Sequence, residues 1–159
     1  MSGRVYVGSH AVLLDSRFRD GDIEADLCGS GHGDFQGIVF RASPEAATSG
    51  KFSGELIYFR PFYANYDQPH YPAIQYFALH RTADGRKMSA SLEVDPKIPK
   101  DEWFHVRIEV RGTVAKVFLN DAEEPALVVP KLESGRSDGL VGFWGWNGRL
   151  ANLKITPKQ

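Results

Sequence analysis

The sequence predicts an all-β fold, an antiparallel β-sandwich, from three observations. Short segments rich in β-branched and aromatic residues recur along the 159 residues, and Gly, Pro, Asn or Asp separates them. In residues 103–111 every second side chain is apolar, the period of a strand with one face on a core. No segment favours a helix longer than about two turns. Many antiparallel strands without an internal repeat leave a sandwich or a barrel.

The expected strands, in order, are 22–27, 35–42, 55–62, 73–81, 103–112, 113–121, 126–132, 139–146 and 150–156. The first alternates apolar and acidic residues, whereas 35–42 and 55–62 are apolar runs that carry Arg41 and Arg60. Residues 43–50 could form a single helical turn that Gly50 ends. We expect one jelly-roll domain over 1–159, because this length is enough for one sizeable core.

Charge and composition exclude several classes of partner. The net charge is −1, from 19 basic and 20 acidic residues, which argues against nucleic acid. No apolar run approaches the roughly 20 residues of a membrane span, so we expect no membrane partner. The first residues lack the apolar stretch of a signal peptide, which suggests the cytoplasm, although a trimmed secreted protein would look the same. Cys28, the only cysteine, excludes an internal disulfide.

The order of segments resembles the concanavalin A-like lectin/glucanase superfamily. The series DGDIEAD, FQGIVFRA, ELIYFRP, IQY, EWFHVRIEV, AKVFLND, GLVGFW and ANLKIT covers about residues 15 to 157. It is most similar to small bacterial domains grouped with laminin G-like modules and with 3-keto-disaccharide hydrolases. The resemblance implies a jelly roll of two antiparallel sheets, one of them concave, and is specific for fold rather than for activity.

The strand expected at 22–27 shows whether the catalytic acids of a hydrolase are present. Glu24 and Asp26 match the first two acids of the E-x-D-x-x-E or E-x-D-x-E strand of β-glucanases, whose retaining mechanism needs two carboxyl groups about 5 Å apart. The last Glu would fall at Cys28 or Gly29, and neither can protonate a leaving oxygen. We therefore expect no β-glucanase mechanism. Glu24 and Asp26 could bind sugar hydroxyls or a cation, or they could pair with arginines on neighbouring strands.

Further candidate ligand-binding residues are polar or aromatic groups on apolar strands. Arg41, Tyr58, Arg60 and Gln75 would suit a polyhydroxylated ligand if their strands were neighbours of the strand with Glu24 and Asp26. The alternative is a buried network of these arginines and carboxylates that binds nothing. Of Trp144 and Trp146, we expect one in the core and one at the rim, with Trp146 beside Asn147 as the candidate. Three aromatics of the loop from Arg60 to Ala73 would form the rim: Tyr63, Tyr66 and Tyr71.

Other short motifs lack the surrounding elements or residues that their function requires. GRSDG, residues 135–139, matches the G-x-S-x-G of a nucleophile elbow, but a strand rather than a helix follows. The histidines lack zinc spacing and no calcium-binding motif is complete. We expect no cofactor and no metal, with a structural calcium ion left open.

The function that these observations favour is a non-catalytic, lectin-like sandwich that binds a saccharide on its concave face. One alternative is a glycoside hydrolase or lyase with unfamiliar acids, drawn from Glu24, Asp26, Glu55 and His105. Another is a structural or protein-interaction module. The saccharide and the oligomeric state stay open.

Overall fold

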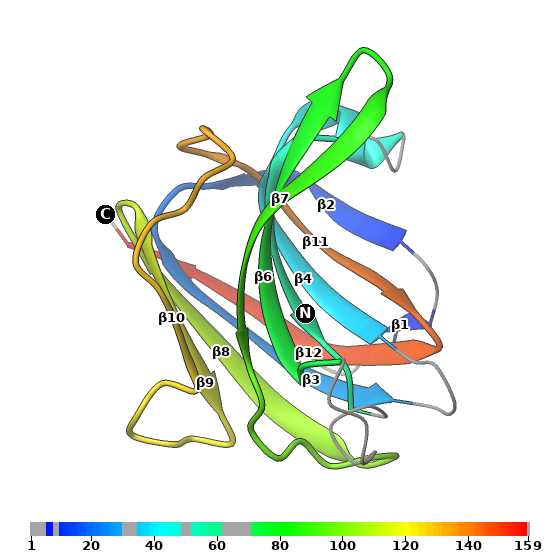
Figure 1. The fold of residues 1–159 in the computed structure, drawn as a ribbon, viewed down its shortest axis with the longest axis vertical. Coiled ribbons are helices and arrows are strands. Elements are labelled where there is room, and N and C mark those ends of the chain that lie inside the picture. The colour runs from blue at the N-terminus through cyan, green and yellow to red at the C-terminus, as the bar shows by residue number, and fades with distance from the viewer. Residues whose placement is uncertain (1–5, 8–9, 30–34, 49–51, 62–70, 159) are drawn as a thin grey trace.

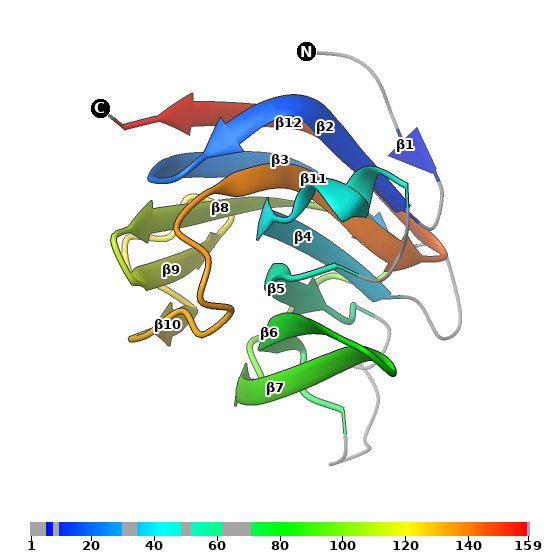
Figure 2. The same cartoon turned by 90° about the horizontal axis from the view of Figure 1, so that it is seen from above.

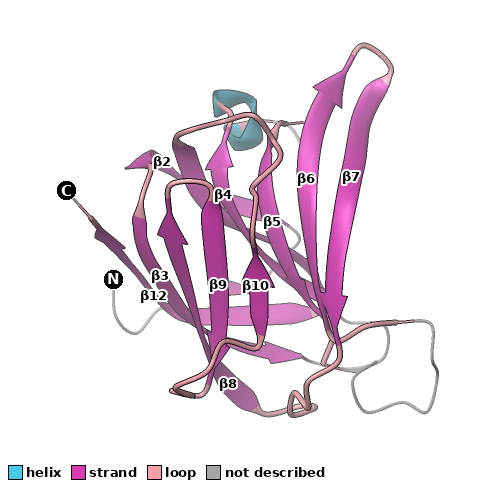
Figure 3. Ribbon diagram, turned by 60° about the vertical axis from the view of Figure 1, so that its left-hand side comes forward, coloured by secondary structure: helices cyan, strands magenta, loops and turns pink. Residues whose placement is uncertain are grey.

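The computed structural model describes residues 6–7, 10–29, 35–48, 52–61 and 71–158, and the regular secondary structure of this part of the chain is nearly all strand (Figure 3). The strands are β1 (Tyr6–Val7), β2 (His10–Phe18), β3 (Gly21–Gly29), β4 (Phe35–Ala42), β5 (Gly54–Phe59), β6 (Ile74–Thr82), β7 (Gly85–Val94), β8 (Trp103–Arg111), β9 (Val114–Leu119), β10 (Leu127–Val129), β11 (Gly139–Trp146) and β12 (Gly148–Pro157). The predicted helical turn is the 3₁₀ helix η1 (Pro44–Ala47).

The strands form two antiparallel six-stranded sheets that pack as a sandwich, which confirms the predicted fold class. Sheet A has the order β1-β12-β3-β8-β9-β10, and sheet B has the order β2-β11-β4-β5-β6-β7. Figure 1 shows the strands, and Figure 2 shows the two layers edge-on with η1 on the outside of sheet B. Chain neighbours β3 and β4 belong to different sheets, and this separation decides where the candidate residues lie.

The sequence missed β1, β2 and β7. The strand β7 is the edge of sheet B, and its segment GRKMSASLEV is polar with few β-branched residues. An edge strand needs little apolar surface, and charged side chains on it discourage pairing with other chains. The strand β2 is the opposite edge of the same sheet. Both edge strands of sheet B thus escaped a search for apolar alternation.

The main core fills the space between the sheets. In β8 the predicted alternation is confirmed, because Phe104, Val106, Ile108 and Val110 are buried while the residues between them are partly exposed. Side chains from sheet B meet them, and Phe59 lies 6.0 Å from Phe104 between ring centroids. This layer of apolar side chains is the principal source of stability.

A second apolar cluster lies on the outer face of sheet B. Its buried members are Val39, Ala42, Ala46, Phe52, Leu56, Leu79 and Leu140. Ala46 comes from η1, so this helix and the segment after it cover one end of the face. The partly buried Tyr58, Phe77 and Trp144 continue the cluster beyond that cover. Sheet B is therefore apolar on both faces, and part of its outer face reaches solvent.

None of the helices in the described residues is long and apolar enough to cross a membrane.

Candidate functional site

Four aromatic side chains form a platform on the outer face of sheet B. They are Phe35, Tyr58, Phe77 and Trp144, and each is partly exposed. The ring centroids lie 4.7 Å apart for Phe35 and Tyr58, and 6.3 Å apart for Phe35 and Trp144. Tyr58 also lies 6.3 Å from Phe77, in an edge-to-face arrangement. We call these four residues the aromatic platform.

Strand register brings the platform together. Trp144 pairs with Gly37, Gly37 with Tyr58, and Tyr58 with Gln75, so these residues form one row across β11, β4, β5 and β6. A Cβ atom at Gly37 would lie 2.5 Å from Leu56 Cδ1 and 2.9 Å from the carbonyl oxygen of Trp144. Because Gly37 has no side chain, the rings of Trp144 and Tyr58 approach to 6.4 Å across it.

Polar groups border the platform. The guanidinium of Arg60 lies over the Tyr58 ring, 4.4 Å from its centroid, and donates to the carbonyl oxygen of Pro72. Beside Tyr58, Gln75 donates a 2.8 Å hydrogen bond from Nε2 to Glu93 Oε2. Glu93 is exposed and Gln75 is 8% exposed, so the carboxylate is the more accessible group. Apolar rings bordered by charged and amide groups suit a ligand with one apolar face and hydroxyls at its edge.

The structure brings together three of the candidates, Tyr58, Arg60 and Gln75. Trp146 stands on the same face of β11 as Trp144, pairs with Phe35 and is 58% exposed, so it reaches solvent at the platform's end. Asn147, in the turn after it, is exposed as well. Tyr71 is 47% exposed, whereas Tyr63 and Tyr66 lie outside the described residues.

Glu24 and Asp26 are not part of this group. They lie on the outer face of sheet A, because Ile23, Ala25 and Leu27 point into the core. Lys154 Nζ approaches Glu24 Oε2 at 3.2 Å. The expected neighbourhood of these carboxylates with Arg41 and Arg60 is therefore not formed, since β3 pairs with β8 and β12 instead of with β4.

Asp26 has two hydrogen-bond partners on neighbouring strands. His105 Nδ1 lies 2.8 Å from Oδ1, and Asn152 Nδ2 donates to Oδ2 at 2.6 Å. Burial by itself raises the pKa of Asp26, but the hydrogen bonds from Asn152 and His105, with the charge of the imidazole, lower it overall below its ordinary value of 3.8. The carboxylate is thus favoured in the folded state.

This geometry predicts a pH-dependent effect of Asp26→Asn. At neutral pH the substitution should lower the free energy of unfolding by about 1 kcal/mol. A carboxyl with a lowered pKa in the folded state contributes stability above its unfolded pKa of 3.8, and that contribution disappears as the pH falls through the folded value. Urea denaturation from pH 7 to pH 2.5 should show the two proteins converging below about pH 4. Asp84→Asn, at an exposed turn, is the control, and a gap independent of pH would contradict the assignment.

Arg41 is a cross-link between the sheets. It is the penultimate residue of β4, and only 3% of it is exposed. Nε and Nη2 both donate to the carbonyl oxygen of Arg19, and Nη2 also donates to Asp20 Oδ1 and to the carbonyl oxygen of Gly112. The interpretation of Arg41 as a neighbour of Arg60 on one ligand-binding face is therefore wrong. It instead joins β4 of sheet B to the β2–β3 turn, which connects the two sheets, and to the β8–β9 turn of sheet A.

Glu55 is separated from the other groups proposed for a hydrolase. Glu55 is fully buried between the sheets, where it accepts hydrogen bonds from the Tyr76 hydroxyl and from Ser134. Burial, with the neighbouring Glu55 carboxylate, raises the pKa of Tyr76. Glu24, Asp26 and His105 lie on the outer face of sheet A. Within the described ranges, no group of three or more His, Cys, Asp or Glu side chains could hold a metal ion.

Sequence reasoning missed three platform residues, Phe35, Phe77 and Trp144, and also Glu93. A signal was present, because residues 35–42 and 55–59 are apolar at both parities, whereas a strand with a solvated outer face alternates. An apolar outer face predicts a contact surface.

Comparisons with known proteins identify solved structures that share this fold. No protein-family model matches the chain, and a search of curated proteins gave no match. Among solved structures, the galectin LEC-6 of Caenorhabditis elegans superposes with a TM-score of 0.65 at 10% identity, covering 96% of this chain and 95% of the galectin. Congerin II with lactose and MES bound gives 0.64 at 13% identity, covering 93% and 100%. The carbohydrate-binding module CBM66 of Bacillus subtilis gives 0.60 at 17% identity, covering 89% and 76%. The chain therefore shares the concanavalin A-like, galectin-type sandwich fold of these proteins.

Proposed function

We propose that this protein is a non-catalytic carbohydrate-binding domain that holds a saccharide on the aromatic platform of sheet B. The observation that carries the proposal is the row of Trp144, Tyr58 and Gln75 across three strands of an apolar outer face, with Gly37 between the two rings. The apolar C–H face of a sugar ring can stack on such rings. Hydroxyl groups at the sugar edge would then reach Arg60, Gln75 and Glu93.

The structural neighbours support this proposal at the level of ligand class. One of them is a carbohydrate-binding module and another was solved with lactose bound. The laminin G-like and 3-keto-disaccharide hydrolase-like assignments stay predictions, since the neighbours named above are galectins and a carbohydrate-binding module.

The alternative of a hydrolase or lyase is weaker on geometry, because its acids are divided between the core and the outer face of sheet A. A protein-interaction module would also use an apolar face. The polar groups distinguish the two functions, because amide and charged side chains at one edge of a small platform can form hydrogen bonds with the hydroxyl groups of a saccharide. Glycan binding separates the two functions.

The test begins with a glycan array, followed by calorimetric titration of the glycan that binds. Arg60→Gln should weaken binding about ten-fold, because a charge-assisted hydrogen bond to a ligand contributes about 1.5–3 kcal/mol and 1.4 kcal/mol is a factor of ten. Trp146→Ala should also weaken it. Trp103 is the matched control, since it is 44% exposed on sheet A, and Trp103→Ala should bind as the parent does. Binding that survives both Arg60→Gln and Trp146→Ala, or that fails only in Trp103→Ala, would contradict the proposed site.

A further inference from the structure

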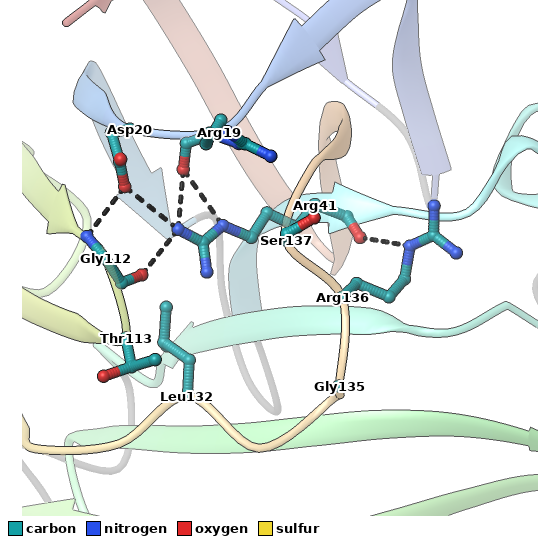
Figure 4. A pocket seen from close by; sticks show the side chains of 9 residues that line it. All are labelled: Arg19, Asp20, Arg41, Gly112, Thr113, Leu132, Gly135, Arg136 and Ser137. Carbon is teal, nitrogen blue, oxygen red and sulfur yellow. Dashed lines mark hydrogen bonds and ion pairs between the residues drawn. The ribbon is translucent and has the colours of Figure 1, made fainter.

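A cavity of about 430 Å³ opens at one end of the sandwich, away from the aromatic platform. Turns and loops of both sheets line it: the β2–β3 turn gives Arg19 and Asp20, the β8–β9 turn gives Gly112 and Thr113, and the loop before β11 gives Arg136 and Ser137. Arg41 forms its wall (Figure 4). The lining residues thus include three arginines and one aspartate.

The buried guanidinium of Arg41 is only partly used by the protein. Its Nε and Nη2 have four hydrogen bonds, described above. Nη1 takes part in none of these four hydrogen bonds. Figure 4 shows that it points into the space above Leu132 and Thr113. Arginine stays protonated in proteins and carries five N–H donors in a planar fork, so this nitrogen presents two donors with a full charge behind them. An almost fully buried side chain therefore offers an open cationic edge to the cavity.

Charged groups of both signs surround the Arg41 guanidinium. Burial lowers the pKa of Arg41 and the nearby Arg19 adds to this, whereas Asp20 and Glu55 oppose it. Among the described residues the Arg19 side chain makes no ion pair, so its charge adds to that of Arg41 at the cavity. Arg136 donates from Nε to the carbonyl oxygen of Arg41, which ties the loop of residues 135–139 to the cavity wall. Ser137 and Thr113 are exposed and add hydroxyl donors.

We propose that this cavity binds an oxyanion group, a sulfate, phosphate or carboxylate, through Arg41 Nη1, Arg19 and the Ser137 hydroxyl. Arginine suits such groups because its planar N–H donors match their oxygen atoms. The site is independent of the aromatic platform, so its failure would leave the saccharide proposal untouched. It also gives a role to Ser137 of the GRSDG segment, which is a loop before a strand and no nucleophile elbow.

Sodium sulfate is the first probe, titrated at low and constant ionic strength while amide signals are followed by two-dimensional ¹H–¹⁵N NMR. Gly112 and Gly135 line the cavity, and we expect their signals to move with a saturable, millimolar dependence, together with Ser137. Shifts that rise linearly without saturation, or that spread over basic residues elsewhere on the surface, would overturn the proposal.

Two pairs of variants distinguish a specific oxyanion site from a general attraction of anions to a basic surface. Ser137→Asp puts a carboxylate into the cavity and should weaken sulfate binding at least about five-fold, whereas the neutral Ser137→Asn, which exchanges the hydroxyl for an amide N–H donor, should weaken it less. Arg19→Gln should weaken binding about three-fold or more. Lys131→Gln removes the same charge from an exposed residue beside the cavity and should have little effect. Equal losses within each pair would contradict the site.

The source of the oxyanion is decided by further titrations. Inorganic phosphate and galactose 6-sulfate are compared with sulfate, and galactose serves as the neutral reference. Tighter binding of the sulfated sugar than of sulfate, lost in Ser137→Asp, would assign the cavity to an acidic saccharide substituent. Equal binding of the sugar and the free ion would assign it to the free anion. No saturable response of Gly112 or Gly135 to any of these anions would refute the site.

Discussion

Glu55→Ala is expected to lower the free energy of unfolding by about 3–5 kcal/mol. Glu55 is 0% exposed. Its Oε2 accepts from the Tyr76 hydroxyl at 2.7 Å, and its Oε1 accepts from the backbone N–H and the hydroxyl of Ser134 at 3.1 Å and 2.6 Å. Alanine would leave these buried donors without an acceptor and would open a cavity. Each unsatisfied buried donor costs about 1–3 kcal/mol, and the cavity adds to this.

Urea denaturation followed by fluorescence measures the loss, and two further variants identify its cause. Glu55→Gln keeps a carbonyl acceptor of the same shape and should lose much less stability. Tyr76→Phe should cost about 1–2 kcal/mol, and adding it to Glu55→Ala should cost less than the sum, since the two residues share one hydrogen bond. A Glu55→Ala protein within about 1 kcal/mol of the parent would mean that the network is not needed.

Glu55 also illustrates which part of the structure the sequence could predict. Alternation in residues 103–111 identified the inner and outer faces correctly, because its apolar and polar residues separate by parity. Residues 55–59 are apolar at both parities apart from Glu55, so the pattern could not show that Glu55, Ile57 and Phe59 point inward. A carboxylate expected at a site accordingly lies in the core, where Tyr76 and Ser134 satisfy it.

The candidate site was predicted in part for a related reason. Tyr58, Arg60 and Gln75 come together because β5 and β6 are neighbours both in the chain and in the sheet. Glu24 and Asp26 were expected to join them, but β3 and β4 lie in different sheets and the partners of β3 come from residues 103–111 and 148–157. Pairing between distant segments depends on the whole topology, which local patterns do not encode. That residues 1–159 form a single domain stays a prediction.

Gly139→Ala is expected to lower the free energy of unfolding by more than about 4 kcal/mol, or to prevent folding. Gly139 begins β11 with φ +152°, a conformation that residues with a side chain rarely adopt. A Cβ atom there would overlap the carbonyl oxygen of Ala42 and lie 2.6 Å from the carbonyl carbon of Arg41. Because these are backbone atoms, the backbone of β4 would have to move at Arg41. The φ of Arg41, 48°, lies outside regular strand geometry. The register of β11 with β4 shifts at this point as well.

Gly85→Ala separates backbone strain from steric overlap. Gly85, in the β6–β7 hairpin, has a similar φ of +136°, but a Cβ atom there would meet nothing within 4 Å. This variant should lose about 1–3 kcal/mol from conformation alone, so the difference between the two variants measures the overlap. Thermal and urea denaturation of both proteins gives that difference. Equal losses would show that β4 yields without penalty, whereas a larger loss at Gly139 would show that the second glycine of GRSDG is needed for the close approach of β11 to β4.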